Sequence, residues 1–304
     1  MREIRIPAFA KVNLRLDILG KRPDTYHELR TIFQTISLHD ELRFRVSRSS
    51  GISLNIQGND SLSLEPVRKN LVYAAVDALR RELEIRSGVE IDLRKKIPAG
   101  RGLGGGSSDA AAALRGYLQL TRRKIPSPRL MEIAASLGAD VPFFLFGGRA
   151  LGIGRGDEIY PLPDIPKLIL LVVSPSDIHV PTPNAYRWLK APALTKARSA
   201  SKLWKFCSLC WSLPAVAGTQ ESGLSNDFES PVFQRHPRLA QIKRALLQRG
   251  ATEASLAGSG SAVFGVFPSP ALARRAAVGF QDEQTFVCET ISRDRYLRKV
   301  QSAP

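Results

Sequence analysis

The stretch that decides the fold is Ile97-Pro-Ala-Gly-Arg-Gly-Leu-Gly-Gly-Gly-Ser-Ser-Asp-Ala-Ala-Ala-Ala, residues 97–113. It runs from a strand pattern through a loop with five glycines among residues 100–106 into an alanine-rich helix. Glycines let backbone N–H groups converge without side-chain obstruction, and a helix N-terminus adds partial positive charge. A strand, a glycine loop and a helix in this order predict a phosphate-binding site. The alternative is a well-capped helix start, since Ser107, Ser108 and Asp109 are good capping residues.

The loop fits neither of two common phosphate-binding patterns. Gly100-x-Gly-x-x-Gly satisfies the dinucleotide fingerprint formally, but that fingerprint also needs an acidic residue about 20 positions later. No Asp or Glu lies between Asp109 and Glu132. The P-loop pattern requires Lys after its second glycine, where this chain has Gly106. The positive charge that faces the phosphate therefore comes from another part of the chain.

Length and hydrophobicity exclude several classes of protein. The chain has 304 residues, of which 43% are hydrophobic, so it is not a disordered chain. The length favours two domains, which we place at residues 1–155 and 156–304. The charged start at Met1 is unlike a signal peptide, and no apolar run is long enough to cross a bilayer. We therefore expect a cytoplasmic protein that does not bind membranes.

The net charge has two interpretations. The chain carries 44 Lys+Arg against 28 Asp+Glu, a net charge of +16. Such an excess serves anionic small substrates and solubility, or it binds nucleic acid. Lys and Arg are spread along the chain, with no run of five and no recognisable basic reading helix. We favour a small anionic substrate and no nucleic-acid partner, and a basic nucleic-acid-binding protein is the alternative from a different class. The sequence does not indicate the oligomeric state.

The cysteines predict neither a disulfide framework nor a metal site. Three are present, and Cys207-x-x-Cys210 has the spacing of a zinc-ligand pair. Cys288 and the four histidines supply no second closely spaced pair, so we expect no structural zinc. Residues 190–222, which contain the cysteine pair, are polar and rich in Ser, Ala and Lys. We interpret them as an irregular or helical insertion that proteases cut readily.

Hydrophobic periodicity predicts alternating strands and helices. Period-two alternation over residues 12–18 predicts a half-buried strand that ends at Gly20, and Asn70 is a suitable cap for a helix with one apolar face. The same reasoning predicts strands at 42–46, 52–56, 89–93, 168–173 and 263–267, and helices at 110–120, 129–137 and 239–248. The predicted fold class is α/β in the α+β sense, with antiparallel strands in the first half and two lobes separated by a groove.

Several short motifs in order resemble one superfamily of kinases. Pro98-x-x-x-Gly-Leu-Gly-Gly-Gly-Ser-Ser-Asp-Ala-Ala resembles the nucleotide loop of the GHMP kinases. More narrowly, other segments resemble the 4-diphosphocytidyl-2-C-methyl-D-erythritol kinase family of the non-mevalonate isoprenoid pathway. They are Ala10-Lys-Val-Asn-Leu with Gly20-Lys-Arg-Pro-Asp-Thr-Tyr-His-Glu-Leu, Gly138-Ala-Asp-Val-Pro-Phe-Phe-Leu, Pro181-Thr-Pro-x-x-Tyr, Gly258-Ser-Gly-Ser-Ala-Val-Phe-Gly and Asn226-Asp-Phe-Glu. The motifs are spread over about residues 7–267.

The resemblance implies a fold, a reaction and two catalytic residues. It implies the two-lobed GHMP kinase fold, in which ATP and the alcohol meet in the groove between the lobes. It implies phosphorylation of the 2-hydroxyl of the diphosphocytidyl alcohol, with Mg²⁺ offsetting the triphosphate charge. It makes Asp140 the catalytic base and Lys11 its partner, which suits a reaction that needs a proton acceptor and positive charge beside the phosphoryl group. The alternatives are a helix cap at Asp140, before Pro142, and a solvated Lys11 on the polar face of its strand.

The resemblance also implies two binding sites and no metal-ligand residues. The alcohol and its cytidine are assigned to Asn13, Tyr26, His27, Thr182, Tyr186, Gly258 and Ser259. ATP is assigned to Pro98, Ala99, Gly100, Arg101, Gly102, Leu103, Gly104, Gly105, Gly106, Ser107 and Ser108. Stacking together with hydrogen bonds to the edge of the ring is how a pocket selects one base. Another small-molecule GHMP kinase and a non-catalytic nucleotide sensor are further alternatives.

Four residues depart from the family's pattern, and none of them is a catalytic residue. Arg101 stands at a loop position that is usually a small residue, so it would be strained there at a positive φ, or it would supply the missing positive charge. Thr25 replaces a turn glycine, Phe9 replaces a proline, and Ala257 lacks the hydroxyl that often precedes Gly-Ser-Gly. These departures bear on the loop geometry more than on the reaction.

Overall fold

The computed structural model describes residues 3–47, 49–58, 67–194 and 223–301. The pair Cys207 and Cys210 and most of the predicted insertion lie outside these residues. The described start of that insertion runs beside the first strand, because Lys21 N donates to Pro192 O at 2.9 Å and Leu194 N donates to Lys21 O at 3.1 Å.

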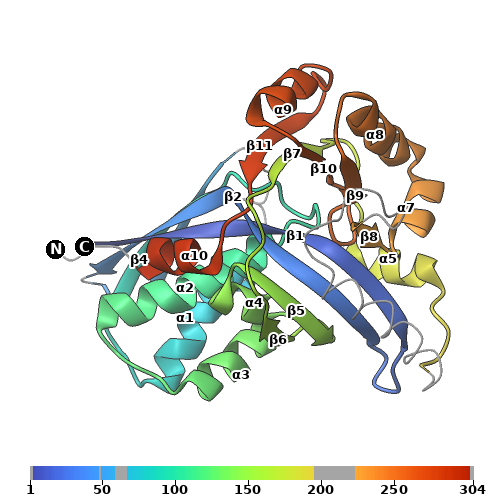
Figure 1. Ribbon diagram of the computed structural model, residues 1–304. Coiled ribbons are helices and arrows are strands. Elements are labelled where there is room, and N and C mark those ends of the chain that lie inside the picture. The colour runs from blue at the N-terminus through green and yellow to red at the C-terminus, as the bar shows by residue number, and fades with distance from the viewer. Residues whose placement is uncertain (1–2, 48, 59–66, 195–222, 302–304) are drawn as a thin grey trace.

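The N-terminal half, together with one short strand from the C-terminal half, forms one sheet against which helices pack (Figure 1). Its strands follow the order β3 (Ile52–Gln57), β4 (Gly88–Arg94), β2 (His27–Ser47), β1 (Glu3–Lys21) and β8 (Ser225–Asn226), while β5 (Arg149–Gly154) pairs with β2 and β6 (Glu158–Pro161) with β5. The pairs β3–β4 and β1–β8 are parallel and the others antiparallel. A first hydrophobic core joins this sheet to α1 (Leu71–Glu82), α2 (Gly105–Thr121), α3 (Ser127–Leu137) and α4 (Val141–Phe146), with a 3₁₀ turn, η2 (Val67–Lys69), before α1.

The C-terminal half forms a smaller antiparallel sheet in the order β11 (Gln284–Glu289), β7 (Ile169–Ser174), β10 (Val263–Phe267) and β9 (Glu253–Leu256). A second core joins it to α5 (Thr182–Leu189), α7 (Glu229–Arg235), α8 (Pro237–Gln248) and α9 (Pro270–Ala277). The last helix, α10 (Arg293–Gln301), returns to the first sheet, where Tyr296 packs on Phe9.

The long hairpin β1–β2 connects the two halves. A third core sets Val12 and Ile36 of this hairpin against Val172 and Phe264 of the smaller sheet. The chain therefore has the mixed α/β class and two-lobed arrangement that the sequence predicts. The boundary at residues 155 and 156 stays a prediction, although β6 still extends the large sheet beyond it.

Most strands and helices lie where the periodicity predicts them. Residues 263–267 form β10 as expected, and the Asn70 side chain caps α1 by accepting from Val72 N at 2.8 Å. No helix in the described part of the chain is long and apolar enough to cross a membrane.

The prediction that the first strand is half-buried was wrong, because both faces of its central part are covered. The apolar face, with Ala10 and Val12, packs against the smaller sheet. The opposite face is covered too, and the Lys11 side chain is only 5% exposed. The interpretation of Lys11 as a solvated lysine is therefore also wrong.

A buried cluster of charges fixes the start of α2 to the sheet. Lys95, which follows β4, forms ion pairs with Asp40 of β2 and with Asp109 of α2, the latter at 2.7 Å. Asp40 also accepts from the backbone N–H of Lys96 and of Ile97, the latter at 2.8 Å. Both carboxylates are buried and share one ammonium group. Burial, together with the charge of Asp40, outweighs the attraction of Lys95 and raises the pKa of Asp109 to about 8.

We expect Asp109 to make the protein less stable as the pH rises. Its pKa is about 3.9 in an unfolded chain and about 8 in the folded protein. Between these values the folded state holds a proton that the unfolded state lacks, so the free energy of unfolding falls with rising pH and levels off above pH 8. Asp109→Asn removes this slope. Urea unfolding at pH 5, 7 and 9 checks this, with Asp77→Asn at a partly exposed residue of α1 as control. Equal slopes in wild type and Asp109→Asn would contradict it.

A second prediction concerns the turn between β1 and β2. Thr25 has φ of 71°, a left-handed conformation that is unfavourable for a β-branched residue. Thr25→Gly relieves about 1–2 kcal/mol of strain and loses about 0.4–1 kcal/mol through the freedom of glycine in the unfolded chain. We therefore expect Thr25→Gly to unfold at higher urea concentration. Thr252 is exposed and does not have a positive φ, so Thr252→Gly should instead destabilise the protein. A Thr25→Gly variant that is also destabilised would show that Thr25 is not strained.

Candidate active site

One cavity of about 1220 Å³ gathers the predicted site residues. It is lined by every residue that the sequence assigns to catalysis, ATP or the alcohol, with the exception of Ser108. Ser108 is buried in the first turn of α2, where its hydroxyl has no hydrogen-bond partner. Motifs that are far apart in the sequence therefore meet around one space.

The glycine loop has the backbone conformation that its glycines permit. Gly100, Gly102 and Gly104 have φ of 65°, 79° and 73°, in the region that other residues rarely adopt. The helix α2 begins directly after this loop at Gly105 and has no side-chain cap. Ser107 lies inside the first turn, so the interpretation as a well-capped helix start was wrong. The uncapped N–H groups at the start of α2, together with the helix dipole, suit the binding of an anion.

The second glycine turn packs directly on the first. A Cβ at Gly102 would lie 1.8 Å from the carbonyl oxygen of Ala257, and a Cβ at Gly258 would lie 2.9 Å from the carbonyl oxygen of Gly102. Asn226 supports this turn, since its side-chain amide donates to Leu256 O at 2.8 Å and to Gly258 O at 2.7 Å. The Asn226-Asp-Phe-Glu motif thus holds the turn in place.

Arg101 avoids the strain that its position would impose at a positive φ. It is not among the residues with positive φ, which fall on its glycine neighbours. Its guanidinium donates to Ser261 Oγ at 3.0 Å and to Ser176 O at 2.9 Å. Arg101 therefore joins the loop to the C-terminal half, and it also lines the cavity.

Lys11 and Asp140 form the charged pair of the cavity. Lys11 Nζ lies 3.4 Å from Asp140 Oδ2, and the Asp140 side chain is 33% exposed. Asp140 directly precedes α4, yet its side chain makes no capping hydrogen bond. The capping interpretation of its carboxylate was therefore wrong. A Cβ at Gly104 would lie 3.0 Å from Lys11 Cγ and one at Gly258 would lie 3.3 Å from Lys11 Nζ, so the lysine lies between the two glycine turns.

A chain of hydrogen bonds orients this lysine. Lys11 Nζ donates to Asn13 Oδ1 at 2.7 Å, and Asn13 Nδ2 donates to Thr31 Oγ1 at 2.7 Å. Thr31 Oγ1 in turn donates to Arg15 O at 2.7 Å. The pairing of β1 with β2 shifts register between Phe9 and Lys11 and again between Asn13 and Arg15. Such irregularities redirect side chains, and these two bracket the residues that enter the cavity.

The far end of the cavity is aromatic. The rings of His27 and Tyr186 are stacked with centroids 4.6 Å apart, and Tyr186 meets Phe228 edge-on at 4.9 Å. Burial and the charge of Lys21 lower the pKa of His27, so its neutral ring can both donate and accept near pH 7. Burial and the charge of Asp140 raise the pKa of Tyr186, so its phenol stays protonated.

The remaining site residues close the cavity between these ends. Thr182 Oγ1 lies 2.9 Å from Ser259 Oγ, which joins the start of α5 to the second glycine turn. Tyr26 lies at the mouth and is 54% exposed. Phe9, one of the residues that depart from the family's pattern, lies away from the cavity and packs on His39, with ring centroids 5.1 Å apart.

Sequence reasoning missed several residues that also line the cavity. Lys21 lies in a quoted motif, and Arg155 stands between two glycines with positive φ, Gly154 and Gly156. A side chain at the centre of a glycine-flanked turn is the signal that could have found Arg155. The missed residues with polar side chains include Lys21, Asn70, Lys95, Arg155, His179, Arg187 and Lys190.

Two segments of the chain match known protein families, one in each half of the fold. Residues 70–148 match the GHMP kinases N terminal domain and residues 215–283 match the GHMP kinases C terminal domain. A homoserine kinase from Cytophaga hutchinsonii, at 22% identity, shares the fold with a TM-score of 0.71 over 96% of this chain and 95% of its own.

Closer relatives narrow the family. The 4-diphosphocytidyl-2-C-methyl-D-erythritol kinase of Solibacter usitatus is 44% identical over 97% of this chain and 91% of its own, and that of Citrifermentans bemidjiense is 43% identical over 91% and 94%. A crystal structure of 4-(cytidine 5'-diphospho)-2C-methyl-D-erythritol kinase is 34% identical, with a TM-score of 0.75 over 94% of this chain and 99% of that one. On this similarity, which spans nearly the whole chain, the protein belongs to the 4-diphosphocytidyl-2-C-methyl-D-erythritol kinase family of the GHMP kinases.

Proposed function

We propose that this protein transfers the γ-phosphoryl group of ATP to the 2-hydroxyl of 4-diphosphocytidyl-2-C-methyl-D-erythritol. The observation that carries the proposal is the position of Lys11, which lies between the two glycine turns and 3.4 Å from Asp140. A phosphate loop, a charged pair and an aromatic end in one cavity suit a kinase whose acceptor carries a nucleobase. The relatives with this reaction in their names extend over nearly the whole chain.

In this mechanism Asp140 is the general base. Its carboxylate is partly exposed to the cavity and takes the proton of the attacking hydroxyl. The adjacent Lys11 ammonium stabilises the negative charge that develops on the phosphoryl group. Asn13 fixes the lysine in place at 2.7 Å, so both groups are ordered before the substrates bind.

The loop at residues 98–106 and the start of α2 hold the phosphates of ATP. Mg²⁺ commonly binds through one or two carboxylates together with phosphate oxygens. Among the described residues no three His, Cys, Asp or Glu form a metal-binding group, which fits an ion held mainly by the phosphates. Asp140, whose carboxylate lines the cavity, is the side chain that would complete its coordination. When bound, the ion offsets the charge of the triphosphate.

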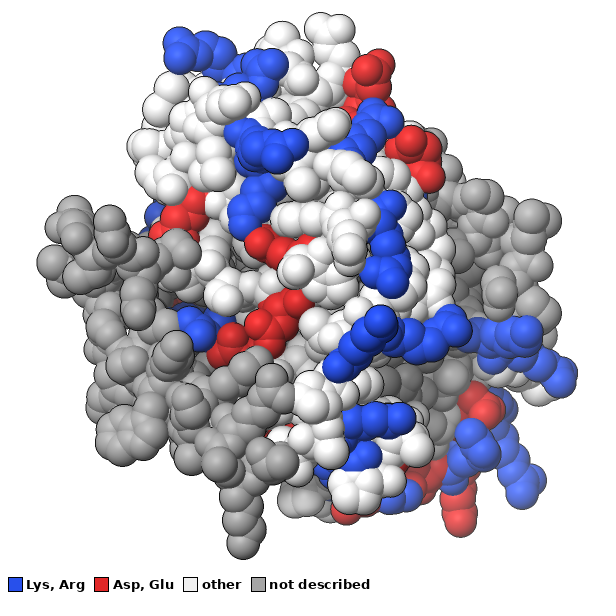
Figure 2. All heavy atoms as spheres, turned by 90° about the vertical axis from the view of Figure 1, so that its right-hand side faces the viewer, with Lys and Arg blue, Asp and Glu red and all other residues white. Residues whose placement is uncertain are grey.

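The aromatic end selects the cytidine. Neutral His27 offers a donor and an acceptor to the edge of the base, while Tyr26 and Tyr186 offer ring faces for stacking. We assign the alcohol part to Thr182 and Ser259, whose hydroxyl oxygens lie 2.9 Å apart. We place the reaction in the cytoplasm, where ATP is available. On the face in Figure 2, basic and acidic side chains are interspersed, and we propose no nucleic-acid partner.

Replacing the proposed base should slow the chemical step. We expect Asp140→Asn to lower kcat by about 10²–10⁴-fold, the usual contribution of a general base, while ATP affinity changes little. Steady-state kinetics together with ATP titration measure both quantities, and Asp77→Asn on α1 serves as the surface control. A kcat near that of the wild type would remove Asp140 from the mechanism.

A substrate panel tests the proposed function itself. With Mg-ATP, we expect ADP release with the diphosphocytidyl alcohol and none with homoserine, mevalonate or galactose. An analogue without cytidine leaves buried polar groups unpaired, at about 1–3 kcal/mol each, so its kcat/KM should fall by at least tenfold. Tyr26→Ala should raise KM for the cytidyl substrate and leave ATP affinity unchanged. Comparable turnover of a plain sugar or amino alcohol would contradict the proposed substrate, while the proposed kinase activity would stand.

A further inference from the structure

Arg155, which also lines the cavity, contacts the ring of a residue in the proposed cytidine site. Its guanidinium carbon lies 5.0 Å from the centroid of the Tyr26 ring, a cation–π geometry. Tyr26 is 54% exposed and lines the cavity, so the arginine covers part of the ring and leaves the remainder accessible. Nothing in the sequence motifs or in the proposed mechanism assigns a role to Arg155.

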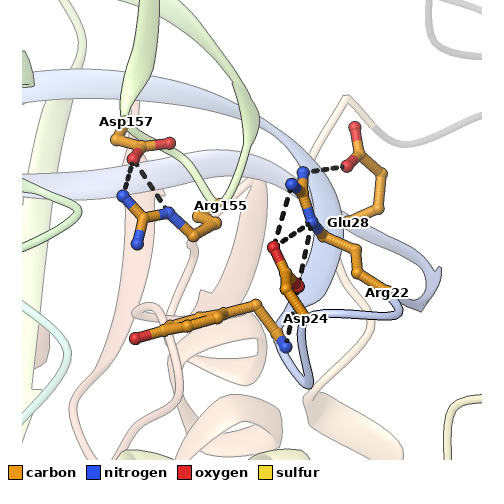
Figure 3. A network of polar contacts seen from close by, with 6 residues as sticks. Arg22, Asp24, Glu28, Arg155 and Asp157 are labelled. Carbon is orange, nitrogen blue, oxygen red and sulfur yellow. Dashed lines mark hydrogen bonds and ion pairs between the residues drawn. The ribbon is translucent and has the colours of Figure 1, made fainter.

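The position of this arginine is fixed by its own turn. Arg155 Nε donates to Asp157 Oδ2 at 3.0 Å, and Nη2 binds the same oxygen (Figure 3). The turn joins β5 to β6, and Gly156 N donates to Ile153 O at 2.9 Å. Leu29 of β2 pairs with Gly154, which places this turn beside the end of the β1–β2 hairpin where its connecting turn carries Tyr26. The guanidinium is therefore held before any ligand arrives.

Among the described residues, the hydrogen bonds that others make to Tyr26 hold its backbone and not its ring. Tyr26 N donates to Asp24 Oδ1 at 3.2 Å, and Arg22 N donates to Tyr26 O at 2.7 Å. Arg22 also joins Asp24, at 3.0 Å, to Glu28, at 2.8 Å (Figure 3). With the backbone fixed, the ring can still rotate about its side-chain bonds. Arg155 is the charged group that lies against the ring itself.

We propose that Arg155, held by Asp157, is a positioning residue for base recognition, which fixes the Tyr26 ring as a stacking surface for the cytosine. The inference rests on the proposed function, since it deepens the role of the same site. Arg155 acts through Tyr26 and not through contact with the substrate. Ordering an exposed ring before binding spares the complex that entropic cost, so the contribution appears as affinity for the cytidine part.

Calorimetric binding of cytidine diphosphate tests the proposal on the whole chain. We expect Arg155→Gln and Asp157→Asn to weaken this binding about two- to fivefold, the factor for one cation–π contact at a partly exposed site. ADP binding and kcat should stay unchanged. Arg155→Lys, which keeps the charge, should retain part of the affinity. Arg129→Gln on α3, another arginine paired with carboxylates, is the control and should bind as the wild type does.

A double-mutant cycle separates positioning from direct contact. If Arg155 acts through the ring, Arg155→Gln has no further effect in a Tyr26→Ala background. An equal loss in both backgrounds means that Arg155 contacts the ligand directly and overturns the proposal. Unchanged affinity in Arg155→Gln overturns it as well and leaves the proposed function standing.

A measurement on the Tyr26 ring without ligand tests the role of Arg155 separately from the proposed function. In protein with labelled tyrosine, Arg155→Gln should shift and broaden the Tyr26 ring signal in nuclear magnetic resonance spectra without ligand. An unchanged signal contradicts the proposal. Wild-type protein that fails to bind cytidine diphosphate contradicts the proposed function instead, and the ring signal then still reports whether Arg155 holds Tyr26.

Discussion

The two glycine turns approach each other so closely that no side chain fits between their backbones, and the active site depends on this approach. A Cβ at Gly102 would overlap the carbonyl oxygen of Ala257, and one at Gly258 would press on both Gly102 and Lys11. The lysine is therefore confined between the two glycine turns. Fixing a lysine costs up to about 2 kcal/mol of side-chain entropy, and here that cost is met on folding, before the substrates bind.

Two lysines lie near the phosphate loop, and their surroundings give them different roles. Lys95 lies between two buried acidic side chains, Asp40 and Asp109, so its charge is balanced within the protein. It attaches α2 to the sheet and leaves little net charge for a ligand. Lys11 faces a single carboxylate, that of Asp140, and both groups line the cavity. The loop has no lysine of its own, and the strand β1 brings Lys11 into the cavity beside it.

Features set by neighbouring residues could be predicted from the sequence, and those set by distant ones could not. The glycine loop, the Asn70 cap and the strand β10 follow from local backbone preferences and periodicity. The burial of Lys11 depends on which elements cover β1, and no alternation within residues 12–18 reports that. The place of Arg155 depends on the pairing of β5 with β2, about 125 residues apart in the chain. The resemblance supplied the long-range grouping of motifs that periodicity lacks.

Arg101 shows why a departure from the family's pattern leaves the loop intact. The positive φ values fall on Gly100 and Gly102, the residues on either side of Arg101, so the position between them accepts a side chain. That side chain binds Ser261 Oγ and Ser176 O, and Arg101 O accepts from Ala262 N at 3.2 Å. The substitution therefore adds a tie between the phosphate loop and the second glycine turn. Since the close contact of these turns confines Lys11, a residue that strengthens it supports the same geometry on which the charged pair depends.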